Sequence, residues 1–291
     1  LELERAGVIR NAQNYLLYGS FDKSVYRAKA GRYEIETGAS FRALARQFAI
    51  GPERSEVIVR LIEGRTVDQM VGQLAEQHGI SEDETTALTG RSKNASPFDS
   101  RLREEFAFLA ALPEDRSLEG YLFPDTYHVW EDELPEGLIY KQLNEFNRRY
   151  GNATVSSAAS PLQDIDDVII LASIVEKEVP ATADRAIVAG IFLNRLKNGM
   201  RLQSDATINY LTGSGRARST NADLEIDSPY NSYRNAGLPP SPIGNPGAKS
   251  IDAVLAPQDT DFFFFLTTEQ GEVLYARTFD EHIQNRVRAG F

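Results

Sequence analysis

An internal repeat near the start of the chain constrains the fold more than any other feature of the sequence. The segment IETGASFRALARQF (35–48) aligns with IEGRTVDQMVGQL (62–74) from the glycine onward. In each copy an apolar segment, RYEI or VIVRLI, precedes the glycine, and a Ser or Thr follows it. Glycine suits a turn, Ser and Thr cap helix N-termini, and apolar residues then recur at helical spacing. The repeat predicts two strand–turn–helix units within residues 31–80 that share one small core.

This pair of units loosely resembles the LysM scaffold, a small glycan-binding βααβ module. A plain α+β accessory domain is the alternative interpretation. With the later segments, the repeat predicts an α+β fold, in which a small LysM-like α/β module at the N-terminal side precedes a larger α+β domain. The expected segments are an N-terminal connecting segment (1–30), the LysM-like module (31–82), a partly helical connection (83–118) and the larger domain (119–291).

Composition excludes several classes of function. The net charge of −11 argues against a nucleic-acid partner, because no basic stripe is present to neutralise phosphates. The lack of cysteine excludes thiol catalysis and disulfides, and three histidines give little basis for a His-rich metal site, so we expect no metal and no cofactor. No stretch reaches the roughly 20 apolar residues that span a membrane. The opening LELERAG, without an initiator Met, suggests a fragment from which an N-terminal signal or anchor has been removed.

The segment LASIVEKEVP (171–180) places a carboxylate on an apolar helix face. At about 100° per residue, Glu178 falls within the apolar face, Glu176 lies at its edge, and Lys177 lies on the polar side. Pro180 ends the helix, so Glu178 occupies the last turn. Burial and the helix dipole would both raise its pKa, as a general acid requires. The alternative is a solvated helix cap, or a glutamate that pairs with an arginine.

The rest of the larger domain mixes helices, strands and one long loop. The segment 228–247 is too rich in Pro, Gly, Asn and Ser for regular structure, and a loop of that length is usually functional or disordered. Helices are expected at 136–149, 182–200 and 281–291, and strands at 261–268 and 272–279.

Five motifs in order resemble the endolytic lytic transglycosylases of peptidoglycan, the YceG-like or MltG group. They are EGYLFPDTY (119–127), LASIVEKE (171–178), FLNRLKNGMRLQSDAT (192–207), SPYNSYRNAGLPPSPIGNPG (228–247), and FFFLTT followed by FDEH (279–282). Together they cover most of residues 119–291, which would then be the catalytic transglycosylase domain. One departure is Ala206, where the family pattern has proline. Such a change alters loop stiffness more than chemistry.

The resemblance implies that Glu178 is the catalytic acid, the residue that the helical pattern also selects. It would protonate the glycosidic oxygen between N-acetylmuramic acid and N-acetylglucosamine and then act as base toward the 6-hydroxyl of the same sugar. The products would be 1,6-anhydro-muramoyl ends, formed without water, and nascent strands would be terminated or trimmed. The expected substrate-binding residues are Gln203, Asp205, Thr207, Tyr230, Asn231, Tyr233 and Asn245.

Each of these side chains also has a structural interpretation, as a turn cap or as core. Two other functions remain open, namely a glycan-binding protein without turnover and a muramidase-type hydrolase that uses water. The expected partners are peptidoglycan glycan strands, peptidoglycan synthases, and the division or elongation machinery, with no nucleic acid. The resemblance also implies a single-pass protein of the inner (cytoplasmic) membrane, held by an N-terminal helix absent from this chain, with the catalytic region outside the cytoplasm.

Overall fold

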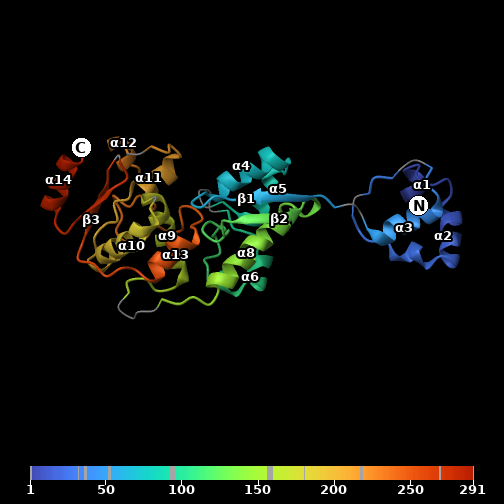
Figure 1. The fold of residues 1–291 in the computed structure, drawn as a ribbon, viewed down its shortest axis with the longest axis horizontal. Helices are drawn as coiled ribbons and strands as arrows, with labels where there is room; N and C mark the ends of the chain where they lie inside the picture. Colours follow the sequence, from blue (N-terminus) through green and yellow to red (C-terminus); the bar gives the residue numbers. More distant parts are fainter. Residues whose placement is uncertain are drawn as a thin grey trace. The chain divides into compact units, whose positions relative to one another are not determined.

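A computed structural model describes residues 2–31, 33–35, 38–51, 54–91, 96–155, 160–179, 181–216, 219–268 and 270–290. The chain forms two compact units (Figure 1). The first contains Leu1–Val57 and His128–Leu134, and the second contains Ile58–Tyr127 and Pro135–Phe291.

The first unit is built on a small helical core. Its helices are α1 (Glu2–Arg5), α2 (Ala12–Phe21), the 3-10 helix η1 (Lys23–Arg27) and α3 (Phe41–Ile50). Tyr15 of α2 and Leu44 and Phe48 of α3 are buried together, and the ring of Tyr15 meets that of Phe41 edge-on at 5.4 Å. The segment His128–Leu134, which also belongs to this unit, carries the 3-10 helix η3 (Glu131–Glu133). It is held by Arg54, whose Nη2 lies 2.6 Å from Glu133 Oε1.

The second unit begins with a strand, short helices and one long helix. Strand β1 (Glu56–Arg60) pairs with β2 (Thr126–Trp130), and the boundary between the units falls within both strands. Rings of Phe108, Tyr121 and Phe146 pack against one another in the core, with centroids 4.9–5.9 Å apart. The helices of this part are α4 (Val67–His78), α5 (Glu82–Thr89), α6 (Arg101–Glu105), α7 (Ala107–Ala110) and α8 (Glu136–Tyr150).

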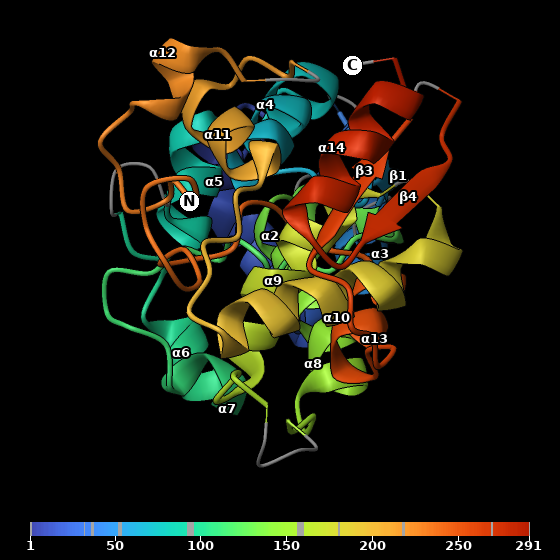
Figure 2. The same ribbon diagram turned by 90° about the vertical axis from the view of Figure 1, so that its left-hand side faces the viewer.

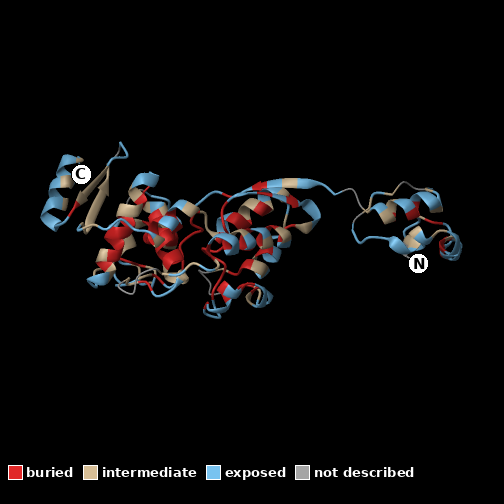
Figure 3. Cartoon of the chain, turned by 60° about the horizontal axis from the view of Figure 1, so that its bottom comes forward, coloured by how far each residue is buried: buried red, intermediate tan, exposed pale blue. Residues whose placement is uncertain are grey.

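The remainder of the second unit is organised around α9 (Ile165–Glu178). Every residue from Val168 to Val175 is buried, because helices cover α9 on several sides (Figures 2 and 3). Those that pack on it are α10 (Thr182–Lys197), α11 (Asp205–Thr212) and α13 (Ala248–Leu255). A short helix, α12 (Asn221–Leu224), follows α11.

The chain closes with a hairpin and a helix. Strands β3 (Phe264–Thr267) and β4 (Val273–Ala276) are antiparallel, with Phe264 opposite Ala276. Helix α14 (Phe279–Arg288) packs against both strands. The predicted strands, the closing helix and the helices near 136–149 and 182–200 are therefore confirmed. The segment 228–247 is irregular, also as predicted.

The two helices that the repeat predicts are confirmed, but the prediction that they share one core is wrong. Ser40 and Thr66 cap α3 and α4 by accepting backbone N–H groups, and Gly38 and Gly64 have positive φ, which favours glycine. The first copy has no strand at 33–35, and Arg32 lies outside the described residues. The two helices belong to different compact units, each with its own packing. The mixed helix and strand content fits the α+β class, whereas the LysM-like module is not confirmed.

Candidate active site

The site is built at the C-terminal end of α9. Asp164 caps the start of this helix by accepting the backbone N–H of Asp167 at 3.1 Å. The helix ends at Glu178, and Val179 is extended. Pro180, the residue predicted to end the helix, lies outside the described residues. The buried helix therefore carries its last turn, with two glutamates, to the edge of the core.

Glu176 is held by an ion pair and neutral donors. Its side chain is 6% exposed, and its Oε1 lies 2.8 Å from Nη2 of Arg185 on α10, which is 7% exposed. The N–H of Gly247 donates to its Oε2 at 3.0 Å, and Ser250 Oγ donates to the same oxygen at 2.9 Å. The arginine partner that the sequence offered as an alternative for Glu178 thus belongs to Glu176. This carboxylate joins α9 to α10 and α13.

Glu178 lies in a different environment, against the start of α11. Ser204 Oγ donates a hydrogen bond to its Oε1, and the N–H of Ala206 also donates to it. Burial raises the pKa of Glu178 above its usual value, and the charge of Asp205 acts in the same direction. The two hydrogen bonds and the charge of Arg195 oppose this rise without cancelling it. A carboxyl with a raised pKa retains its proton at a pH where an ordinary glutamate has lost it.

Arg195 places a fixed positive charge beside this carboxyl. It comes from the last turn of α10 and is 7% exposed. Its Nε donates to the carbonyl of Phe263 at 2.7 Å, its Nη1 donates to that of Leu202 at 2.5 Å, and its guanidinium lies 5.2 Å from the Phe264 ring centroid. These contacts fix the cation, so its field on Glu178 does not depend on a mobile side chain.

Asp205 and Tyr233 lie together beside Glu178. The Tyr233 hydroxyl donates to Asp205 Oδ1 at 3.2 Å, and Ser219 Oγ donates to the same oxygen at 2.6 Å. Burial raises the pKa of Tyr233, and the charges of Asp205 and Glu178 add to this effect. The tyrosine therefore stays a neutral hydrogen-bond donor near the carboxyl group.

Thr207 and Gln203 complete this cluster in different ways. Thr207 is fully buried, and its hydroxyl lies 2.8 Å from Ser232 Oγ and donates to the carbonyl of Ser204 at 2.8 Å. Gln203 has an exposed side chain, and its φ of 51° is the only positive value at a non-glycine residue among the described residues. Its backbone N–H donates to the carbonyl of Ser232 at 3.1 Å. An L-residue in this conformation carries strain, which often marks functional positions.

The remaining predicted site residues use their polar atoms inside the protein. Asn231 is fully buried, and its side-chain amide donates to the carbonyls of Leu224 and Ile226. The Tyr230 hydroxyl lies 2.5 Å from Ser241 Oγ. Both contacts shape the 228–247 loop. The structure thus brings Glu178, Asp205, Thr207 and Tyr233 together with the backbone of Gln203, whereas Tyr230, Asn231 and Asn245 hold the surrounding loop.

Asn245 is the most heavily bonded of these loop residues. Its Oδ1 accepts the backbone N–H groups of Gly120 and Leu122 at 2.9 and 3.0 Å. Its Nδ2 donates to the carbonyl of Arg65 at 3.0 Å and to Glu119 Oε1 at 3.3 Å. One side chain therefore joins three segments that are far apart in sequence.

Glu119, beside Asn245, is a second buried carboxyl that the sequence analysis did not select. It is 3% exposed, and the N–H of Val67 donates to its Oε1 at 3.0 Å. Burial raises its pKa from 4.5 to about 8, against a smaller lowering by that hydrogen bond. The only sequence signal was its place at the head of the EGYLFPDTY motif. Ser204 and Arg195 were also missed, although each lies within a quoted motif.

Comparison with known proteins gives the family. Residues 1–288 match the model of the YceG-like family. The endolytic murein transglycosylase of Bacillus subtilis (strain 168) is 31% identical over 287 residues, which is 96% of this chain and 78% of that protein. The endolytic murein transglycosylase of Streptococcus pneumoniae serotype 2 is 31% identical over 301 residues, covering 97% of this chain and 54% of that protein.

A solved structure gives the same result. The 2.6 Å crystal structure of a YceG-like protein from Listeria monocytogenes superposes with a TM-score of 0.63 at 27% sequence identity. The match covers 97% of this chain and 93% of the other. Since the family model matches nearly the full length and two independent kinds of comparison agree, the chain belongs to the YceG-like family.

Proposed function

We propose that this chain is an endolytic murein transglycosylase, a lytic enzyme that cleaves peptidoglycan glycan strands between N-acetylmuramic acid and N-acetylglucosamine. Family membership and the relatives of that name support the activity. The observation that carries the chemistry is the carboxyl of Glu178, which is partly buried, bonded by Ser204 and raised in pKa. Burial, a positioned hydrogen bond and a raised pKa are what a general acid requires.

In the proposed reaction Glu178 gives its proton to the glycosidic oxygen as the bond from that oxygen to the muramoyl C1 breaks. The 6-hydroxyl oxygen of the same muramoyl residue then bonds to C1, and its proton returns to Glu178. The product is a 1,6-anhydro-muramoyl end, and no water is consumed. Ordinary glycosidases use a second carboxylate for the water or the nucleophile. Here Asp205 is already engaged by Ser219 and Tyr233, which supports a mechanism with a single carboxyl.

Substrate contacts divide into two groups in this proposal. Gln203, Asp205 and Tyr233 lie around Glu178 and offer hydrogen bonds to sugar hydroxyl and acetamido groups. Thr207, Tyr230, Asn231 and Asn245 act on the substrate indirectly, because their polar atoms fix the loops around the site. All catalytic groups named here lie in residues 119–291, which we propose as the catalytic domain.

The substrate also sets the proposed location. Peptidoglycan lies outside the cytoplasm, so the catalytic region would act there. In the part of the chain that the structure describes, no helix has the length and apolar character needed to cross a membrane. Attachment to the inner membrane by a preceding helix, and cooperation with peptidoglycan synthases and the division or elongation machinery, are further parts of the proposal.

The mass of the products tests the proposed reaction. Purified peptidoglycan is digested with this chain, and the released fragments are analysed by mass spectrometry. We expect muropeptides with anhydro ends, which are lighter by one water than hydrolysed reducing ends. Reducing ends would instead indicate a muramidase-type hydrolase, and intact strands with bound protein would indicate a glycan-binding protein without turnover.

A further inference from the structure

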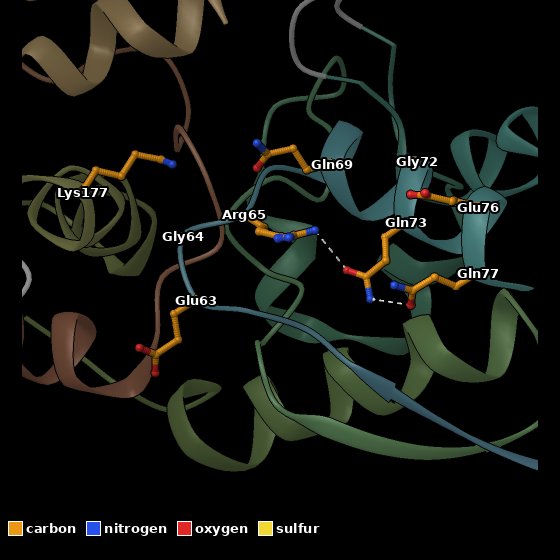
Figure 4. Close-up of a pocket in the computed structure, with 9 residues that line it drawn as sticks. All are labelled: Glu63, Gly64, Arg65, Gln69, Gly72, Gln73, Glu76, Gln77 and Lys177. Atoms are coloured by element: carbon orange, nitrogen blue, oxygen red, sulfur yellow. Dashed lines mark hydrogen bonds between the residues drawn. The ribbon is translucent and has the colours of Figure 1, made fainter. Parts of the chain in front are cut away.

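A polar groove lies beside the last turn of α9, and Lys177 is the residue of that turn that lines it. It has a volume of about 550 Å³ and is lined by one face of α4, the loop before it, and Lys177 (Figure 4). Lys177 and Glu178 are neighbours in sequence, but their side chains leave the helix about 100° apart. A ligand in this groove would therefore lie beside the candidate active site without occupying it.

Amide groups form an ordered row along the α4 face of the groove. Arg65 Nη1 donates to Gln73 Oε1 at 3.2 Å. Gln73 Nε2 in turn donates to Gln77 Oε1 at 3.3 Å and to the carbonyl of Arg60 at 3.0 Å. Figure 4 shows Arg65, from the loop before α4, reaching Gln73, which bonds Gln77 one turn further along the helix. The row fixes hydrogen-bonding groups at intervals, as recognition of an extended polar ligand requires.

Charges of both signs line the groove without being paired there. Within the described residues, Lys177 makes no hydrogen bond or ion pair, and the same is true of Glu76. Arg65 makes one side-chain hydrogen bond and no ion pair in that part of the chain. Burial lowers the pKa of Lys177, while the charges of Glu119 and Glu176 oppose this change. The lining thus holds two cations, Lys177 and Arg65, and two acids, Glu63 and Glu76. Charges of both signs suit a ligand with carboxylates and an amino group.

The groove offers no surface on which a sugar ring would stack. None of its lining residues is aromatic, and aromatic faces are the usual platform for the apolar faces of sugars. Amides, cations and acids are better matched to a peptide. A peptidoglycan strand carries such a peptide on each muramoyl residue, with carboxylates and, where a diamino acid is present, a free amine.

We propose that this groove binds the peptide stem of a peptidoglycan strand whose glycan lies at Glu178. Lys177 and Arg65 bind its carboxylates, Glu76 binds its amino group, and Gln69 and Gln77 bond its amides. The proposal rests on the proposed function, since it takes peptidoglycan as the substrate. The groove would be a second binding site on the enzyme, through which strands that carry peptide stems bind better than strands without them.

Gly72 provides a direct test, because it lines the groove inside α4 and a Cβ there meets nothing within 4 Å. The variant Gly72→Leu fills the groove without removing a charge, and a helix tolerates leucine better than glycine. Calorimetry with a soluble stem tetrapeptide and the full chain is expected to show at least about tenfold weaker binding for Gly72→Leu. We expect the same loss for Lys177→Gln and Arg65→Gln, while Lys249→Gln, at an exposed position on α13, binds like the parent.

Thermal melts separate blocked binding from misfolding. We expect Gly72→Leu to melt at or above the temperature of the parent. Peptide binding that is unchanged in Gly72→Leu and Lys177→Gln would overturn the proposal. So would a groove that binds a neutral chitin oligosaccharide and not the peptide.

Cleavage rates link the groove to the reaction. Peptidoglycan strands with intact stems are compared with the same strands stripped by an amidase. The parent should cleave intact strands faster, and Gly72→Leu should reduce that ratio toward one. A ratio of one in the parent, despite cleavage of both substrates, would overturn the stem proposal alone. If the parent cleaves neither substrate, the proposed function fails, and the peptide calorimetry still decides whether the groove binds a stem.

Discussion

Glu176 Oε1 lies 2.8 Å from Arg185 Nη2, and both side chains are more than nine-tenths buried. This pair separates the roles of two glutamates that stand two positions apart in one motif. Glu176 is neutralised by a cation and by donors from Gly247 and Ser250. Among the residues that the structure describes, Glu178 has no such cation in hydrogen-bond contact, and its pKa is raised. One acid therefore holds helices together, and the other is left available for proton transfer.

The ion pair predicts that Glu176→Gln destabilises the fold. Glutamine keeps the shape of the side chain but leaves the buried Arg185 guanidinium without a counter-charge. Breaking a buried pair by removing one partner typically destabilises a protein by about 3–5 kcal/mol. Urea unfolding of parent and variant measures the loss. An unfolding free energy equal to that of the parent would contradict the account.

Glu145→Gln on α8 is a matched control, because its partners Arg148 and Arg149 are exposed on the same helix. Ion pairs of that kind contribute about 0–1 kcal/mol.

Because the pKa of Glu119 is raised, we predict that the stability of the fold decreases as pH rises. Its folded pKa of about 8 lies above its ordinary value of 4.5, so the folded state binds this proton more tightly than the unfolded state. The resulting stabilisation is complete below pH 4.5 and is lost as pH rises through about 8. At full ionisation the loss is on the order of 5 kcal/mol.

Glu119→Gln removes this ionisation and isolates its effect. We expect the melting temperature of the variant, relative to the parent, to increase from pH 5 to about pH 8 and then to level off. Other titrating groups are common to both proteins and cancel in the difference. A difference that is flat, or that decreases with pH, would show that Glu119 does not titrate in this way.

Ser204→Ala should change how activity depends on pH. The Ser204 hydroxyl bonds Glu178 and lowers its pKa, and it makes no cap hydrogen bond to α11. Its removal should raise the pKa of Glu178 further and move the high-pH limb of kcat/KM to higher pH. Without this hydrogen bond the Glu178 carboxyl is less well oriented, which should also reduce the cleavage rate by about tenfold. Ser214→Ala, at an exposed position after α11, should retain the parent profile. A limb that moves to lower pH would contradict the assignment.

Asn245→Ala should destabilise the fold more than it weakens any direct substrate contact. The substitution leaves the N–H groups of Gly120 and Leu122 without their acceptor inside the core. Unsatisfied buried groups of this kind predict a loss of roughly 2–4 kcal/mol. Chemical denaturation measures it, with Asn198→Ala, at an exposed position, as the control. Unchanged stability with reduced substrate affinity would instead support a direct binding role for Asn245.

The sequence predicted Glu178 because helical periodicity is local. Once a segment is helical, the angle of each side chain follows from its position, and the structure places Glu178 in a partly buried site as that pattern indicated. The catalytic role itself stays a prediction. The caps at Ser40 and Thr66 were predictable for the same reason, since capping depends on neighbouring residues.

Contacts between segments that are distant in sequence could not be predicted from the sequence. Ser204 meets Glu178 across 26 positions, and Glu119 meets Val67 across 52. No spacing rule gives such contacts, because they depend on how α4, α9 and α11 pack. The prediction that the two repeat copies share one core was wrong for this reason. Each helix was predicted correctly, but its packing partners lie elsewhere in the chain.

Substitution of Glu178 tests the central claim most directly. Glu178→Gln keeps the size of the side chain but can neither donate nor accept the catalytic proton. Digestion of purified peptidoglycan by parent and variant, with folding verified by thermal melts, measures the yield of anhydro muropeptides. The account predicts a yield from Glu178→Gln lower by at least about 10²–10⁴-fold at unchanged folding. A folded Glu178→Gln protein that releases anhydro products at the parent rate would contradict it.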